Sequence, residues 1–292
     1  MKKKKPHKFK KKLDWVPRRG SSQSSRRFSD VSVVYGLNSV RELCKVHPED
    51  VKSLHICRRD GEALSESLSP KGSSFKASLY SLSLEGKEEF QTKVQSLGVF
   101  QNDENVQGIF AVRKPYRYQN EGYLQDLASS NRRPGLILAL DEINDPHHFG
   151  VLIRTASVCG VTTIIIPKDR SVSVTPVVSK IACGGVEHVT IVQVTNLGRA
   201  IEDLKKENYW AIGLSEHAGE SLSQMKLDFD AILIVGNEGQ GIRPGIQKKC
   251  DYWVHLEAPG EMSSLSASVA GSIALYFTAM KEIDRRKALL KT

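Results

Sequence analysis

The amino-acid sequence predicts an α/β protein in which a mostly parallel sheet carries helices on both faces, preceded by a small α/β domain. From residue 135 onward, apolar, β-rich runs of strand length alternate with segments of helix length. The runs are apolar throughout, which indicates strands buried on both faces, as in parallel sheets. The expected strands are 136–140, 163–166, 189–194, 210–214, 231–235 and 252–256, and the expected helices are 149–159, 175–181, 197–208 and 264–281.

A smaller unit precedes this alternation. Residues 31–35 and 51–57 are strand-like, residues 39–44 begin a helical pattern, and residues 106–112 return to a strand, whereas residues 61–88 are poor in large apolar side chains. Residues 115–134 contain prolines, tyrosines and arginines and are expected to be a linker. The predicted organisation is a basic tail (1–30), a small α/β domain (31–114), the linker (115–134) and the larger α/β domain (135–292).

The N-terminal tail carries the whole positive excess of the chain. Residues 1–27 hold 8 Lys and 4 Arg against the single Asp14, a net charge of +11, so the remainder of a chain that totals +9 sums to −2. Such a segment cannot bury enough apolar surface to fold alone. We expect it to bind RNA phosphates through counterion release, with a merely solubilising tail as the alternative.

Composition limits the class of protein. No apolar run reaches the roughly 18 to 20 residues of a membrane helix, and no apolar stretch follows the charged N-terminus as it would in a secretory signal. Five cysteines without a CxxC pair are typical of reduced thiols. We therefore expect a soluble, cytoplasmic protein that has no membrane partner.

Three blocks follow expected strands of the larger domain. Residues 144–155 read NDPHHFGVLIRT, residues 232–241 read ILIVGNEGQG, and residues 263–270 read SSLSASVA. Ligands of open parallel sheets bind at the carboxyl ends of the strands. The blocks are therefore expected to converge on one site.

Taken singly, each block has more than one interpretation. The glycines of the second block fit a ligand-binding turn or a plain strand-to-helix turn, but neither a dinucleotide fingerprint nor a P-loop. Arg154 is either a salt-bridge arginine or a group that binds a phosphate or acts on a hydroxyl. Ser264 is either the N-cap of the last helix or a site residue.

Taken together, the blocks resemble the motifs of the SpoU (TrmH-like) RNA ribose methyltransferases of the SPOUT superfamily, over about residues 135–280. Other segments are similar to the branch that methylates a guanosine ribose of large-subunit (23S) rRNA, namely residues 35–36, 106–109, 167–171, 182–184 and 194–197. That branch has an N-terminal RNA-binding domain like ribosomal protein L30e. Residues 31–114 fit such a domain in length and pattern.

The resemblance implies a C-terminal trefoil knot, a homodimer formed through the knotted domain, and S-adenosylmethionine as the cofactor, with no metal. Carried over by position, the cofactor contacts are Gly236, Leu256 and Leu265. The catalytic residues are Arg154, which assists deprotonation of the ribose 2′-hydroxyl, with Glu238 and Ser264 completing the site. Residues 1–27 and 31–114 are expected to bind the rRNA.

Some positions depart from the family pattern. His148 and Ser266 stand where the family usually has asparagine, and residues 257–260 read Glu-Ala-Pro-Gly where Pro-Met-x-Gly is common. The expected function is an RNA 2′-O-ribose methyltransferase. Two alternatives stay open: a tRNA ribose 2′-O-methyltransferase of the same family, and a catalytically weakened RNA-binding or ribosome-assembly factor with the same fold.

Overall fold

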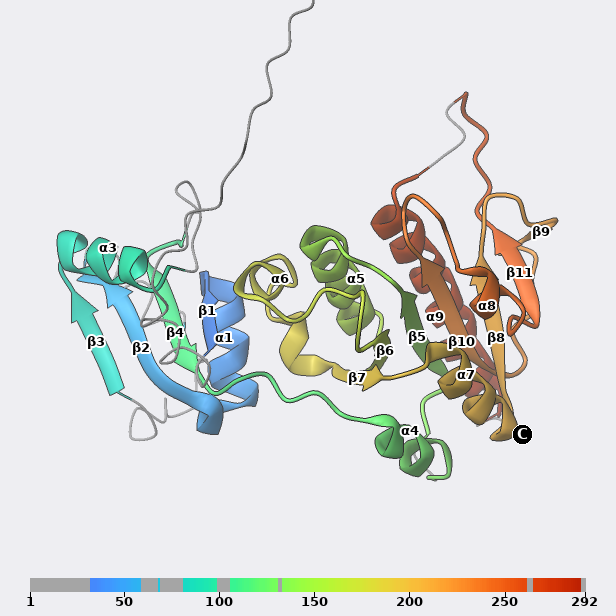
Figure 1. Cartoon of the computed structure of the whole chain (residues 1–292), viewed down its shortest axis with the longest axis horizontal. Coiled ribbons are helices and arrows are strands. Elements are labelled where there is room, and N and C mark those ends of the chain that lie inside the picture. The colour runs from blue at the N-terminus through green and yellow to red at the C-terminus, as the bar shows by residue number, and fades with distance from the viewer. Residues whose placement is uncertain are drawn as a thin grey trace, which may run out of the picture. The chain divides into compact units, whose positions relative to one another are not determined.

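The computed structural model describes residues 32–58, 68, 81–98, 106–130, 133–261 and 265–289. Val31–Thr292 form one compact unit, which contains two sheets (Figure 1). The basic tail, residues 1–30, lies outside the described residues.

The smaller sheet is mixed, with the strand order β1-β4-β2-β3. Strand β4 is antiparallel to both β1 and β2, while β2 and β3 are parallel. Helix α1 contributes Val40 and Leu43 to the apolar cluster on one face, and α3 contributes Phe90 to the cluster on the other. Strand β3 and helix α3 were not expected from the sequence. The elements are β1 (Ser32–Tyr35), α1 (Leu37–Val46), η1 (Pro48–Asp50), β2 (Val51–Cys57), β3 (Ser81–Glu85), α3 (Lys87–Ser96) and β4 (Ile109–Arg113).

The larger sheet has seven strands within the described residues, in the order β7-β6-β5-β10-β8-β11-β9, and every pairing is parallel. This arrangement confirms the mostly parallel sheet predicted from the apolar runs. The strands are β5 (Leu136–Asp141), β6 (Thr163–Pro167), β7 (Thr190–Val194), β8 (Tyr209–Leu214), β9 (Glu220–Ser221), β10 (Asp230–Gly236) and β11 (Tyr252–His255).

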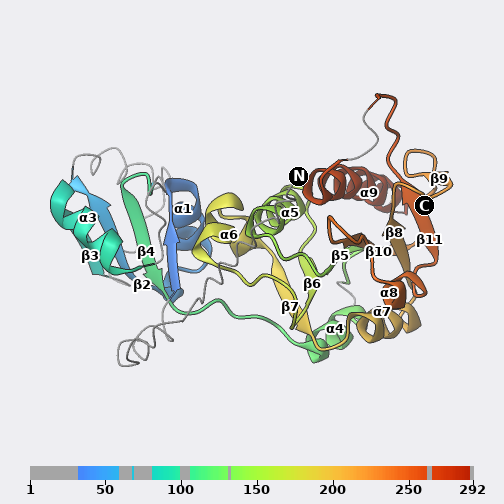
Figure 2. The same ribbon diagram turned by 45° about the horizontal axis from the view of Figure 1, so that its top comes forward.

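Helices cover both faces of this sheet, as Figure 2 shows. Alternate residues of β5 point to opposite faces: Leu136, Leu138 and Leu140 join one cluster, and Ile137 and Ala139 join the other. The first face is packed by α5 (Pro146–Val158), α6 (Pro176–Ile181) and α9 (Ala267–Leu289), and the second by α4 (Glu121–Ala128), α7 (Leu197–Lys206) and α8 (Pro244–Gln247).

Sequence signals explain where these helices begin and how closely they pack. Asp145 caps α5 by accepting hydrogen bonds from the backbone N–H groups of His147 and His148, and Pro146 occupies the first helical position. A Cβ atom on Gly271 of α9 would lie 2.8 Å from a methyl carbon of Leu152. Glycine at this position therefore lets α9 approach α5 closely.

The expected linker is partly helical. Residues 115–134 contain α4, and Gln119 forms an isolated parallel bridge with Val192 of β7. The Tyr116 hydroxyl donates to the carbonyl oxygen of Val189 at 3.1 Å. This stretch therefore packs on the larger sheet over part of its length.

A buried ion pair joins β4 to the turn η4 (Gly185–His188). Arg113 is only 4% exposed, and its Nη1 lies 2.6 Å from Oε1 of Glu187, while Nη2 lies 3.5 Å from the carboxylate of Asp50. Burial, partly offset by the nearby Arg113, raises the pKa of Glu187 above its ordinary value. Among the described residues, none of the helices combines the length and apolarity that a membrane crossing requires.

Candidate active site

A cavity of about 500 Å³ opens at the carboxyl ends of β8, β10 and β11. It brings together four of the residues singled out in the sequence, namely Gly236, Glu238, Leu256 and Leu265. The cavity is lined by residues 214–217 at and beyond the end of β8, residues 235–242 at and beyond the end of β10, residues around the end of β11, and residues at the start of α9. Parallel sheets commonly bind their ligands at this edge.

The loop after β10 closes on itself tightly. The backbones of Asn237 and Gly241 exchange two hydrogen bonds, of 3.1 and 2.8 Å, and Gly241 has a positive φ of 64°. A Cβ atom on Gly236 would overlap the backbone of Gly241 and Ile242. The sequence predicted that Gly236 makes room for a ligand, whereas the structure shows that its missing side chain first makes room for the loop itself.

Two further contacts fasten this loop to the end of β5. The Asn237 side chain donates to the carbonyl oxygen of Glu142 at 2.9 Å and accepts from the Gly239 N–H at 2.8 Å. Arg243 binds the fully buried Asp141 through its backbone N–H and its Nε, both at 2.8 Å. The loop is therefore held in place before any ligand binds.

The loop after β11 is held by a carboxylate. Oε1 of Glu257 accepts hydrogen bonds of 2.9 Å from the hydroxyls of both Ser221 and Ser223, and these bonds lower the pKa of Glu257. Glu257 directly follows Leu256, whose side chain lines the cavity. We define these three residues as the Glu257 clamp.

The start of α9 differs from the sequence interpretation. The helix begins at Ala267, and the Ser266 hydroxyl accepts from the Val269 N–H at 3.4 Å, so Ser266 rather than Ser264 lies at the capping position. Serine and asparagine rank alike as N-caps. The departure at Ser266 therefore preserves the capping role that an asparagine would have. Ser264 lies outside the described residues.

Arg154 does not line the cavity. It lies on α5 with an exposed side chain, and among the described residues it forms no ion pair. Val158, one helical turn further on, is 81% exposed on the same side of α5. The neighbouring Thr155 hydroxyl lies 2.9 Å from the Ser272 hydroxyl of α9. Arg154 is thus free to contact a molecule outside this chain.

His148 approaches the cavity from the first turn of α5. Its Nδ1 lies 3.6 Å from Oε2 of Glu238, and the side chains are 19% and 54% exposed, respectively. In the sequence His148 stands out as a departure from the family pattern and, being a histidine, as a nearby group that can take a proton near neutral pH. Its contact with the loop after β10 was not visible there, because the two residues are far apart along the chain.

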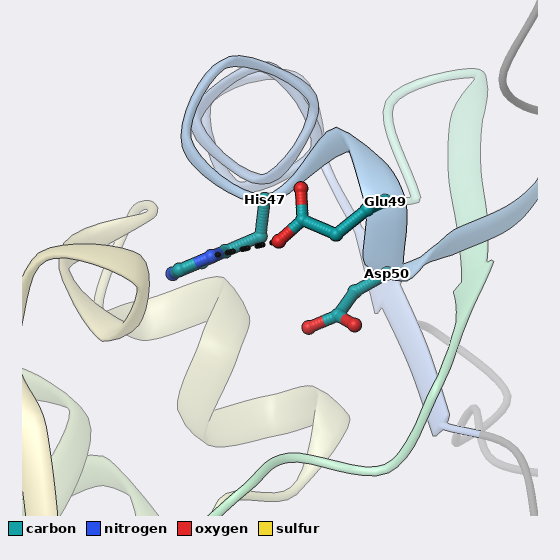
Figure 3. Close-up of side chains that lie close together, drawn as sticks. All are labelled: His47, Glu49 and Asp50. Atoms are coloured by element: carbon teal, nitrogen blue, oxygen red, sulfur yellow. Dashed lines mark ion pairs between the residues drawn. The ribbon is translucent and has the colours of Figure 1, made fainter.

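A second cluster of titratable groups lies at η1, where His47, Glu49 and Asp50 are close enough to share an ion (Figure 3). The His47 ring and the Glu49 carboxylate point toward each other, with Nδ1 and Oε1 3.5 Å apart. Asp50, however, is already surrounded by Arg113, Lys114 and Arg117, with nitrogen–oxygen distances of 3.4 to 3.6 Å. These cations neutralise Asp50, so we assign the cluster to ion pairing.

Other cavity residues were missed by the sequence analysis. Residues 215–217 follow β8, and Trp253 lies within β11. Their position after or within expected strands was the one signal in the sequence that could have placed them in the site. Their residue types, unlike a glycine-rich loop, suggest no particular chemistry.

Comparison with known proteins gives consistent matches. Residues 135–276 match the model of the SpoU rRNA methylase family. The 23S rRNA (guanosine-2′-O-)-methyltransferase RlmB of Pseudomonas putida is 33% identical over 248 residues, which cover 85% of this chain and 96% of that protein. The protein of the same name from Coxiella burnetii is 32% identical over 259 residues, covering 89% and 97%.

Solved structures agree at the level of the fold. The SpoU methyltransferase AviRb from Streptomyces viridochromogenes, crystallised in complex with the cofactor AdoMet, superposes with a TM-score of 0.66 at 18% identity. The match covers 87% of this chain and 91% of that one. The similarity therefore extends over both sheets.

Proposed function

Because this chain belongs to the SpoU rRNA methylase family, we propose that it transfers a methyl group from S-adenosylmethionine to a guanosine ribose 2′-hydroxyl of 23S rRNA. The observation that carries the proposal is the cavity in which Gly236, Glu238, Leu256 and Leu265 meet at the carboxyl edge of the sheet. Relatives that are named as 23S rRNA (guanosine-2′-O-)-methyltransferases match the chain over nearly their full length.

The cavity suits the proposed methyl donor. Its volume lies within the range of about 300 to 1,000 Å³ that is typical of small-molecule sites. The glycine turn exposes backbone groups at its edge, and Leu256 and Leu265 offer apolar surface to an adenine ring. When bound, S-adenosylmethionine supplies an electrophilic methyl group. The protein then has to align the ribose oxygen and remove one proton.

Arg154 is assigned to the ribose oxygen. An arginine remains protonated in proteins, so its role is to position the 2′-hydroxyl and to stabilise the negative charge that develops on the oxygen. Glu238, at the mouth of the cavity, and Ser264 complete the proposed site. A cationic group with no ion-pair partner among the described residues is suited to this task, since it has no competing carboxylate.

The same face of the protein supports a homodimer. Helix α9 exposes a row of large apolar side chains at helical spacing, and Val158 of α5 adds to it; the row comprises Val269, Ile273, Tyr276 and Phe277. Exposed apolar patches of this kind mark interaction sites. A second copy would cover them and would bring Arg154 to the dimer interface.

Two further features belong to the proposal. The segment that follows β11, together with α9, would form the trefoil knot of the SPOUT superfamily. In this knot the chain would pass through the loop after β10. Residues 31–114, whose mixed sheet carries α1 and α3 on opposite faces, would be the L30e-like domain that captures rRNA. The basic tail of residues 1–27 would add affinity for phosphates.

Mass-spectrometric mapping of ribose methylation tests the substrate. Ribosomal and transfer RNA are compared from cells with and without the gene, and the purified protein is then supplied with the unmethylated RNA. We expect one 2′-O-methylguanosine of 23S rRNA to disappear from the deletion strain and to be restored in vitro. Loss of a tRNA methyl group would favour the tRNA alternative, and unchanged methylation would favour the binding factor.

A further inference from the structure

The contact between His148 and Glu238 has the arrangement of a histidine–carboxylate pair. The Glu238 carboxylate faces Nδ1 of the ring at 3.6 Å, and the other ring nitrogen, Nε2, forms no hydrogen bond within the described part of the chain. Glu238 also lines the cavity. His148 is not itself among the lining residues, so the pair lies at the edge of the cavity.

This arrangement determines which ring nitrogen can accept a proton. A neutral imidazole carries one N–H, and a carboxylate beside Nδ1 favours the form in which Nδ1 keeps the hydrogen and Nε2 has a free lone pair. At 3.6 Å the contact is too long for a hydrogen bond. Catalytic contacts are often long in unliganded sites and tighten when substrate binds.

A second carboxylate lies close to His148. Asp145 caps the same helix, and its carboxylate accepts hydrogen bonds from the backbone N–H groups of His147 and His148. The His147 side chain is exposed and is the only other titratable group in this turn of α5. Two carboxylates, those of Asp145 and Glu238, therefore lie near His148.

We propose that His148 Nε2 accepts the proton of the ribose 2′-hydroxyl and that Glu238 is the positioning residue for its ring. The 2′-oxygen loses its proton to Nε2 as it bonds to the methyl carbon; the carbon–sulfur bond breaks and its electron pair remains on sulfur, which becomes neutral. The imidazolium then releases the proton to water. Arg154, which cannot accept a proton, stabilises the oxygen. This assignment rests on the methyl transfer proposed above.

The ring tautomer can be read without any turnover. In the ¹⁵N-labelled full-length protein, nitrogen chemical shifts of histidine rings distinguish a protonated Nδ1 from a protonated Nε2, and the signals of His148 are identified as those missing from His148→Asn. We expect the neutral ring to carry its hydrogen on Nδ1 and to lose this preference in Glu238→Gln. A neutral ring protonated at Nε2 would overturn the proposal.

Kinetics test the same residue during the reaction. Single-turnover methylation of a 23S rRNA fragment is measured from pH 5.5 to 9 for the parent, His148→Asn and, as a matched control, His147→Asn. We expect the parent rate to fall at acid pH as the ring becomes protonated. His148→Asn should be slower by about a hundredfold or more and should lose this acid limb, while His147→Asn behaves like the parent.

Binding of S-adenosylmethionine, measured by calorimetry, should be unchanged in His148→Asn. A His148→Asn variant with the parent rate and pH profile would refute the role of His148 and leave the methyltransferase assignment intact. If the parent methylates neither rRNA nor tRNA, the proposed function fails. The kinetic role of His148 then fails with it, and the tautomer measurement still decides the geometry of the pair.

Discussion

Gly236 is the position at which one added carbon atom has the clearest structural consequence. A Cβ atom there would overlap the backbone of Gly241 and Ile242, so Gly236→Ala and Gly236→Val should open the loop after β10. We expect both variants to lose S-adenosylmethionine binding in calorimetry, with valine the more severe. Gly239→Ala is the matched control, because a Cβ atom at Gly239 meets only the Asn237 side chain at 3.6 Å. Normal binding by Gly236→Val would show that the loop does not form the cofactor site.

We expect Arg154 to act on the reaction rather than on the fold. Its exposed side chain has no ion pair among the described residues, so Arg154→Ala should leave the melting temperature and the affinity for S-adenosylmethionine nearly unchanged. Turnover should fall by about a hundredfold or more, the loss expected for one well-placed electrostatic group. Arg154→Lys should recover little, since an ammonium lacks the planar fork of a guanidinium. Arg199→Ala, which removes an exposed arginine from α7, is the control; equal rates in both variants would argue against the role of Arg154.

At the scale of single elements, periodicity predicted the larger sheet well. The apolar runs at residues 136–140, 163–166 and 231–235 became β5, β6 and β10 with shifts of one residue at most, because strands buried on both faces have few polar interruptions. Strand β3 and helix α4 were missed. In β3 the alternating leucines, Leu82 and Leu84, are exposed and Glu85 is buried, which is the reverse of the usual burial pattern, and α4 buries only Leu124 and Ala128.

The site was predictable where a motif lies in one segment and not where two segments meet. The glycine loop and the residues around it could be assigned by position, whereas the contact of His148 with Glu238 and the Glu257 clamp depend on tertiary structure. The departure at residues 257–260 illustrates this limit. In the sequence Glu257, the first of these residues, was only a difference from the family pattern. In the structure its carboxylate binds Ser221 and Ser223 and so holds the loop after β11 in place.

The Glu257 clamp should tune the affinity for the cofactor. Hydrogen bonds from Ser221 and Ser223 lower the pKa of Glu257, so the carboxylate is ionised and the clamp intact at neutral pH; it should be lost only as acid protonates Glu257, below the ordinary glutamate pKa of about 4.3. Glu257→Gln weakens both acceptor contacts, so we expect several-fold weaker S-adenosylmethionine binding at pH 7.5. Glu261→Gln, in the same loop, should bind as the parent does. Equal affinities in the two variants would remove the clamp from the cofactor site.

For the whole molecule, the apolar row on α9 predicts the oligomeric state. We expect light scattering to give the mass of a dimer for the parent and of a monomer for Phe277→Glu, because a buried charge at the interface has no partner. Leu82→Glu is the control, since Leu82 is 43% exposed and Phe277 is 44% exposed, yet Leu82 lies on β3 of the smaller sheet. A parent protein that is monomeric at micromolar concentration would contradict the dimer.

We expect the basic tail to contribute electrostatic affinity for RNA. Residues 1–27 carry 12 of the 42 Lys and Arg residues, and without them the remaining chain has a net charge of −2. Deleting residues 1–27 should leave the melting temperature and the affinity for S-adenosylmethionine unchanged, because the described helices and strands and the cavity all lie within Val31–Thr292. RNA affinity should fall. If four or five phosphate contacts are lost, the slope of log affinity against log salt should flatten by about 3 to 4.5.

Titrations of an rRNA fragment between 50 and 300 mM salt measure both slopes. A variant in which the Lys and Arg residues of the tail are replaced by Gln separates the effect of charge from that of length. Identical slopes for the full and truncated proteins would show that phosphates are bound by the folded domains alone.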